Sequence, residues 1–272
     1  MEIDSGKKLA VLIDAENISS KYIKTILDEA SNEGSIIIKR IYGNWTNNQM
    51  AAWKDVVLDN SIQPIQQYSN SVGKNSSDSS MIIDAMDLMH AGRLDGFCIV
   101  SSDSDFTRLA ARLKENELYV LGMGEQKTPK SFINACSKFL YLDILYSEGK
   151  LADEIILKNE GSKRPDEVIS TPPAKKVKKV EPDKTAAANE GSGKDIKNIM
   201  RAITTLIEEN SDDDGWILSA LLGSQLLKRF PDFDVRNFGF KQLNLFIGSL
   251  GIFEVKRGAG SVVYIRTKVD KK

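Results

Sequence analysis

Apolar runs alternate with helical patterns along the first half of the chain. Six short runs rich in branched and aromatic residues predict strands, at residues 9–13, 36–42, 62–66, 96–100, 119–121 and 140–144. Between them, apolar residues recur at three- and four-residue steps, as Met81, Ala85 and Met89 do, which predicts helices that pack by one face. Strands that alternate with helices are typical of an α/β fold with a mainly parallel sheet.

The second half of the chain predicts a linker and then a smaller domain. Residues 148–193 lose apolar periodicity and gather proline, lysine, alanine and glycine, which is linker composition. Amphipathic helices follow at about 196–207, 216–230 and 240–250, and apolar runs at 252–255 and 262–265 flank a basic, glycine-rich tip. Three helices and a hairpin describe a winged helix-turn-helix of the α+β class. The predicted domains are therefore 1–147 and 194–268, with 148–193 between them.

Charge is divided unevenly between the two predicted domains. Residues 1–147 hold 15 Lys and Arg against 19 Asp and Glu, whereas residues 195–272 hold 12 against 10. Binding to nucleic acid by bulk charge is therefore not predicted, and any such contact must come from local patches. Cys98 and Cys136 each lie within an apolar pattern, so we expect buried, reduced thiols.

Targeting signals favour a location inside the cell. No stretch approaches the roughly 20 apolar residues that span a bilayer, and the first residues lack the layout of a signal peptide. We therefore expect a cytoplasmic protein without membrane contact. A nuclear location is the alternative for a eukaryotic chain, because Lys163 and Arg164 precede a basic block in a bipartite pattern, although a solvated linker is the plainer explanation of the block. The block consists of Lys175, Lys176, Lys178 and Lys179.

Carboxylates follow two of the predicted strands. Asp14 ends the first strand, Asp103 and Asp105 follow the fourth, and Asp78 opens the helix before the fourth. Because ligands collect at the carboxyl ends of parallel strands, we expect these four side chains to share one crevice. Clustered carboxylates hold hard divalent cations, so the pattern predicts one or two Mg²⁺ or Mn²⁺ ions, which offset phosphate charge and lower the pKa of a bound water.

Other residues support this site or argue for a plainer role. Asn17 offers a neutral oxygen or a hydrogen bond to substrate, Lys74 a phosphate contact, and Asp84, deeper in the same helix as Asp78, a supporting carboxylate. Aspartate is also an ordinary N-cap residue, so Asp14, Asp78 and Asp103 could each simply start a helix. Their coincidence at strand ends favours a shared site.

Several other phosphate and hydrolase chemistries lack their motifs. The chain contains no G-x-x-x-x-G-K-[ST] loop, and Gly122 and Gly124 lack the third glycine of a dinucleotide fingerprint. A haloacid-dehalogenase-like phosphatase needs Asp where Glu16 stands, and G-x-S-x-G is absent. Hydrolysis of small phosphate esters by the carboxylates remains an alternative.

The acidic segments resemble the NYN domain family, in its LabA-like branch of the PIN-like nucleases. Four segments carry the resemblance: residues 12–17 (LIDAEN), 73–75 (GKN) leading to Asp78, 83–88 (IDAMDL) and 100–106 (VSSDSDF). The resemblance implies a PIN-like three-layer α/β/α fold and a divalent-metal-dependent ribonuclease whose products carry a 5′-phosphate and a 3′-hydroxyl. It also implies an acidic catalytic and metal-binding set of Asp14, Asp78, Asp103 and Asp105.

The C-terminal segment is similar to OST-HTH, or LOTUS, domains. Trp216 and the segments 238–243 (FGFKQL) and 251–255 (GIFEV) carry this likeness. It implies binding of RNA, single-stranded or structured and including G-rich RNA, together with protein partners. The candidate RNA contacts are Lys228, Arg229, Arg236, Lys241, Lys256 and Arg257. We expect core positions at Trp216, Phe240, Leu243 and Phe246.

Two functions from different classes follow. The first is a metal-dependent RNA endonuclease whose C-terminal domain retains the substrate through the linker. The second is a catalytically weak or inactive RNA-binding adaptor that keeps the fold. The sequence predicts neither the RNA target nor the oligomeric state.

Overall fold

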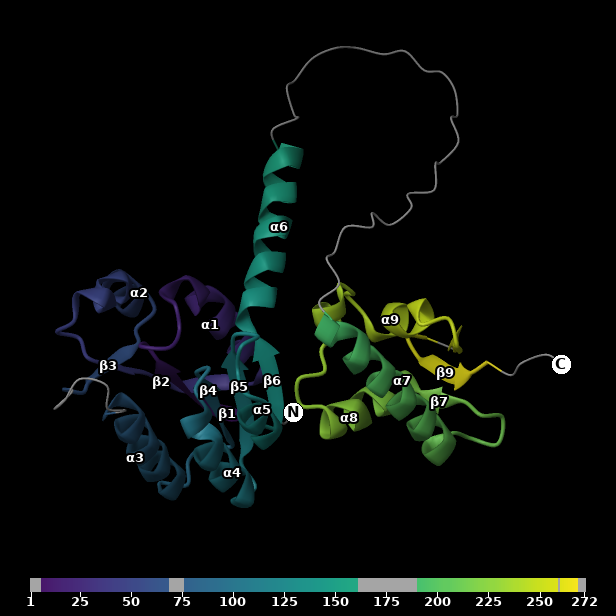
Figure 1. The fold of residues 1–272 in the computed structure, drawn as a ribbon, viewed down its shortest axis with the longest axis horizontal. Coiled ribbons are helices and arrows are strands. Elements are labelled where there is room, and N and C mark those ends of the chain that lie inside the picture. Colours follow the sequence, from purple (N-terminus) through teal and green to yellow (C-terminus); the bar gives the residue numbers. More distant parts are fainter. Residues whose placement is uncertain (1–5, 69–75, 161–189, 259, 269–272) are drawn as a thin grey trace, which may run out of the picture.

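Two domains make up the structure, an α/β domain and a smaller helical domain with its own sheet (Figure 1). The structure, a computed structural model, describes residues 6–68, 76–160, 190–258 and 260–268. Within those ranges, no helix combines the length and the apolar composition needed to span a membrane.

Strands and helices alternate through the N-terminal domain, as predicted. Its elements are β1 (Lys8–Asp14), η1 (Ser20–Tyr22), α1 (Ile23–Glu33), β2 (Ser35–Gly43), η2 (Asn48–Trp53), α2 (Lys54–Asp59), β3 (Gln63–Gln66), α3 (Ser76–His90), β4 (Gly96–Val100), η3 (Ser104–Phe106), α4 (Thr107–Glu115), β5 (Tyr119–Gly124), α5 (Lys130–Ala135), β6 (Lys138–Tyr141) and α6 (Leu142–Glu160).

The sheet is parallel and reverses its winding in the middle. Its strand order is β3-β2-β1-β4-β5-β6, and every pairing between neighbours is parallel. The chain moves outward from β1 to β3 and then returns to the other side of β1 with β4. The carboxyl ends of β1 and β4 therefore meet where the strand order reverses, which is where open α/β sheets bind ligands.

Helices cover both faces of this sheet, which gives three layers. Residues alternate between the two faces along β1, because successive side chains of a strand point to opposite sides. Val11 and Ile13 pack with residues of α1, α2 and α6, whereas Ala10 and Leu12 pack with residues of α3, α4 and α5. Cys98 and Cys136 are buried free thiols in these two layers. The predicted PIN-like α/β/α class is confirmed.

The end of the domain differs from the prediction in one respect. A strand was expected at 140–144 and a linker from 148, but β6 ends at Tyr141 and α6 runs on to Glu160. The run from Leu140 to Leu145 fits a strand or a helix, because its buried residues are spaced by two positions, as in a strand, and by three, as in a helix. The basic block at 175–179 lies outside the described residues.

The C-terminal domain has the predicted three helices and hairpin. Its elements are α7 (Glu190–Asn210), β7 (Ile217–Leu218), α8 (Ser219–Arg229), η4 (Val235–Phe238), α9 (Leu243–Ser249), β8 (Phe253–Arg257) and β9 (Val263–Thr267). The strands form an antiparallel sheet in the order β7-β9-β8, and one apolar core joins the sheet to the helices.

Trp216 does not belong to that core, contrary to the prediction. Phe246 is buried, and Phe240 and Leu243 pack against the core as expected. Ile217 is also buried, however, so its neighbour Trp216 points to the opposite side of the chain. There the indole ring lies beneath two cations, with Lys256 Nζ 5.6 Å and the Arg266 guanidinium carbon 4.5 Å from its centroid.

Candidate metal centre

Three carboxylates meet at the carboxyl edge of the parallel sheet. Asp78, Asp103 and Asp105 each place an oxygen within 4.8 Å of the others. Asp78 comes from the first turn of α3 and is buried. Asp103 and Asp105 belong to the turn after β4, where Asp103 is half-buried and Asp105 is exposed. The structure therefore brings together three of the four predicted ligands, with one side of the cluster open.

Asp103 is both an N-cap and a member of this cluster. Its Oδ1 accepts a hydrogen bond of 2.9 Å from the Asp105 N–H, which caps η3, and its own N–H donates to Ser101 Oγ at 3.1 Å. The Asp103 carboxylate therefore fixes the turn through Oδ1 and also belongs to the cluster with Asp78 and Asp105. The two interpretations of Asp103 are thus compatible.

Asp14 lies beside the cluster but outside the set of three. Its Oδ2 accepts hydrogen bonds of 2.8 Å from Asn17 Nδ2 and from Ser101 Oγ, and its Oδ1 accepts the N–H groups of Glu16 and Asn17 at 3.1 and 3.3 Å. Burial raises the pKa of Asp14, and the bonds from Asn17 and Ser101 oppose that rise. Asn17 therefore holds Asp14 in place.

Ser101 connects the two strand ends and was not predicted. Because Ile13 pairs with Val100 in the sheet, the next residues, Asp14 and Ser101, lie side by side. The buried Ser101 hydroxyl donates to Asp14 and accepts from the N–H of Asp103. Its position directly after an apolar strand was the available signal, and only the pairing of β1 with β4 shows its partner.

The pKa of Asp78 reflects the negative charge gathered at the site. Burial raises its pKa to about 7, and the negative charges of Asp14, Asp103 and Asp105 add to that rise. Like charges held together in a poorly solvated place resist ionisation unless a cation neutralises them. Carboxylate oxygens are also the ligands that Mg²⁺ and Mn²⁺ prefer. The donor set therefore fits a hard divalent cation.

Asp84 and Lys74 are not part of the described cluster. The Asp84 carboxylate accepts hydrogen bonds from the guanidinium of Arg40 and the hydroxyl of Tyr42, both on β2. It therefore joins α3 to β2, on a part of the helix away from Asp78. Lys74 lies outside the described residues.

The family model for the NYN domain matches residues 8–143, which is half of the chain and includes the cluster. The chain belongs to the NYN family. A second model, for the OST-HTH/LOTUS domain, matches residues 194–264. A crystal structure of a Vibrio parahaemolyticus protein of unknown function is similar over 52% of this chain and 96% of its own, at 18% identity and a TM-score of 0.44. None of the curated proteins matches this chain.

Exposed lysines contact acidic and aromatic groups of the NYN domain and were not predicted. Lys127 Nζ is 2.8 Å from Glu125 Oε2, and the Glu125 N–H donates to Ser102 Oγ at 2.9 Å, next to Asp103. Two further lysines lie over tyrosine rings, with Nζ 4.7 and 5.0 Å from the ring centroids. They are Lys21 over Tyr22 and Lys150 over Tyr146. Glu125 thus connects Lys127 to the turn that carries Asp103.

The predicted RNA contacts of the OST-HTH domain fall into two groups. Five are exposed, at the end of α8, before α9 and at the end of β8: Lys228, Arg229, Lys241, Lys256 and Arg257. Arg229 is paired with Glu209 at 2.8 Å. Arg236 differs, because its guanidinium is partly buried between carboxylates of the two domains.

Proposed function

We propose that this protein is a divalent-metal-dependent ribonuclease, in which the NYN domain hydrolyses RNA phosphodiesters and the OST-HTH domain retains the RNA. NYN is a nuclease-like domain and OST-HTH is an RNA-binding domain. The observation that carries the proposal is the cluster of Asp78, Asp103 and Asp105 within 4.8 Å, at the point where the strand order reverses.

Asp78, Asp103 and Asp105 would hold the cation, with Asp14 beside them. When bound, a divalent cation supplies Lewis-acid stabilisation of the charge that develops on the phosphoryl group. Asn17 and Ser101 keep the Asp14 carboxylate fixed, so that the acidic set does not have to rearrange during the reaction. The raised pKa of Asp78 means that this carboxyl retains a proton near neutral pH until a cation favours its ionised form.

The proposal requires that an anionic substrate approach a negatively charged site. Lys21, Lys127 and Lys150 have exposed side chains on the NYN domain, and we expect them to contact the RNA backbone as it enters. The OST-HTH domain adds a second point of attachment, which raises the effective concentration of RNA near the carboxylates. A cleavage assay on mixed cellular RNA, with and without Mg²⁺ or Mn²⁺, tests the proposal beside the Asp103 variant described below.

We expect the double substitution Lys256→Ala and Arg257→Ala to weaken RNA binding about tenfold at moderate salt. Both side chains are exposed at the end of β8, and the removal of each cation that binds a phosphate should reduce the slope of log K against log salt by about 0.7 for single strands. Fluorescence anisotropy in EDTA, which prevents turnover, measures affinity at several salt concentrations.

The matched control removes the same charge from another exposed face, by Lys197→Ala with Arg201→Ala on α7. We expect the control to bind RNA like the wild type. Equal weakening of both double variants would contradict a local contact at β8 and indicate a bulk-charge effect instead.

A further inference from the structure

Strand β6 forms one edge of the NYN sheet, and the OST-HTH domain lies against it (Figure 1). The backbone N–H of Phe139 in β6 donates a hydrogen bond of 2.7 Å to the carbonyl of Pro231. An uncovered edge strand leaves such N–H groups free to pair with other chains. The OST-HTH domain thus satisfies a backbone group that a sheet edge otherwise exposes.

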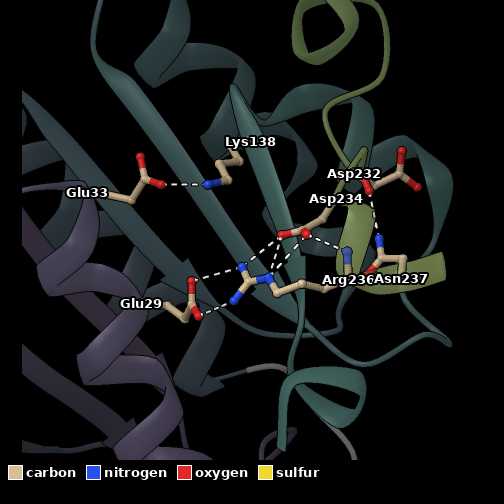
Figure 2. A network of polar contacts seen from close by, with 7 residues as sticks. All are labelled: Glu29, Glu33, Lys138, Asp232, Asp234, Arg236 and Asn237. Carbon is tan, nitrogen blue, oxygen red and sulfur yellow. Dashed lines mark hydrogen bonds and ion pairs between the residues drawn. The ribbon is translucent and has the colours of Figure 1, made fainter. Parts of the chain in front are cut away.

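Arg236 forms the central contact between the domains (Figure 2). Its two terminal nitrogens donate to the carboxylate of Glu29 on α1, at 2.6 and 3.1 Å. Its Nε and Nη2 also donate to Asp234 of its own domain, at 3.0 and 2.8 Å. Paired parallel bonds of this kind between arginine and a carboxylate fix orientation as well as distance.

Asp232 makes a second polar contact with the opposite polarity. Its Oδ2 accepts a hydrogen bond of 2.7 Å from the Tyr141 hydroxyl and one of 3.0 Å from Lys130 Nζ. The Asn237 side chain donates to the Asp232 carbonyl at 2.9 Å and braces the segment from within (Figure 2). The NYN surface therefore presents the Glu29 carboxylate to Arg236 and the Lys130 ammonium to Asp232.

The surroundings of Arg236 favour the paired state. Burial opposes its charge, but the hydrogen bonds that Arg236 donates to Glu29 and Asp234 outweigh burial and raise the pKa of Arg236 above its usual value. The bonds with Arg236 likewise lower the pKa of Asp234, although burial alone would raise it. Removal of Glu29 would take away one of the two carboxylates that the guanidinium hydrogen-bonds in a partly desolvated place, which is unfavourable, although the charge of Glu148 also acts on Arg236.

We propose that residues 231–236 are a docking segment for the β6 edge, and that the two domains of one chain are held together in solution by this polar contact. Arg236 then serves as a docking residue and not as an RNA contact, because its N–H donors are directed to two carboxylates. The contact is largely ionic and partly exposed, so it opens as ionic strength rises. The proposal does not depend on catalysis by the NYN domain.

The first test compares Glu29→Arg with Asp28→Arg, which makes the same charge change one residue earlier on the exposed side of α1. Hydrogen exchange at the Phe139 amide reports on the docked edge, and small-angle scattering reports on the distance between domains. We expect Glu29→Arg to speed exchange at Phe139 about tenfold or more and to increase the radius of gyration. Asp28→Arg should match the wild type at low salt. At high salt, the contact between the domains should open in Asp28→Arg and in the wild type alike.

Several outcomes would overturn the proposal. They are rapid exchange at Phe139 in the wild type, equal behaviour of the two α1 variants, or a concentration-dependent doubling of mass that places the contact between two chains. Unchanged exchange in the buried strand β1 excludes unfolding as the cause of any difference. For the role of Arg236, Arg236→Ala should leave the salt slope of RNA binding unchanged, and a reduction of about 0.7 would identify an RNA contact instead.

Discussion

The substitution Asp103→Asn should lower metal-dependent RNA cleavage by about 10²- to 10³-fold. Asparagine keeps the shape of the side chain and an Oδ1 acceptor, so the hydrogen bond from the Asp105 N–H that caps η3 can persist. What disappears is one negative charge of the cluster with Asp78 and Asp105. The variant therefore separates cation binding from folding, and initial rates on a labelled RNA with saturating Mg²⁺ or Mn²⁺ measure the effect.

Asp87→Asn is the matched control, because Asp87 lies on α3 with Asp78 but is exposed. It should cleave RNA like the wild type. Cleavage that survives Asp103→Asn would reject the carboxylate cluster as the site of reaction. Tight RNA binding without turnover in the wild type would instead support the adaptor function, and release of inorganic phosphate from an aryl phosphate would support a phosphatase.

The substitution Asp78→Asn should make the metal-free protein more stable at pH 8, by on the order of 5 to 10 °C in Tm. The pKa of Asp78 in the folded state is raised from 3.8 to about 7, so the folded protein holds a proton there that the unfolded chain has released. Stability from this group is therefore present at low pH and is lost as pH rises from about 4 to about 7. Asparagine carries no charge and removes that loss.

Thermal unfolding from pH 5 to pH 8, with and without Mg²⁺, measures this effect. A bound cation favours the ionised cluster, so Mg²⁺ should stabilise the wild type most at pH 8, by about 2.7 kcal/mol when its concentration is 100 times Kd. Asp78→Asn should gain less from Mg²⁺ although it starts from a higher Tm. An equal gain in both proteins would contradict a metal-binding role for Asp78, and a lower Tm for the metal-free variant at pH 8 would contradict the raised pKa of Asp78.

Much of the N-terminal fold could be predicted from local patterns. The run from Leu9 to Ile13 is buried throughout, and a fully buried strand requires apolar residues on both of its faces, which the sequence displays directly. The carboxylates at strand ends were informative for a related reason. Parallel strands end at a common edge, so Asp14 and Asp103 could be assigned to one region before their distance was known.

The errors arose where one local pattern fits two structures. Trp216 was assigned to a helix and to the core, but it directly precedes the two-residue strand β7, and its side chain lies on the side of the chain opposite to the buried Ile217. So short a strand exists only through its pairing with β9. Asp84 lies on α3, whereas the residues that it bonds, Arg40 and Tyr42, lie on β2. These partners become visible only when α3 packs on β2. Such partners are chosen by packing and not by spacing along the chain.

The sequence by itself determined the alternation of strands and helices, the two domains and the acidic chemistry of the strand ends, because these depend on residue type and on periods of a few residues. Tertiary structure alone decided that Ser101 links Asp14 to Asp103, since this depends on the pairing of β1 with β4. It also decided that Arg236 faces Glu29, a contact made by domain packing across more than 200 positions of the chain. Local patterns do not predict contacts between residues so far apart in the sequence, because these contacts form only when the elements pack.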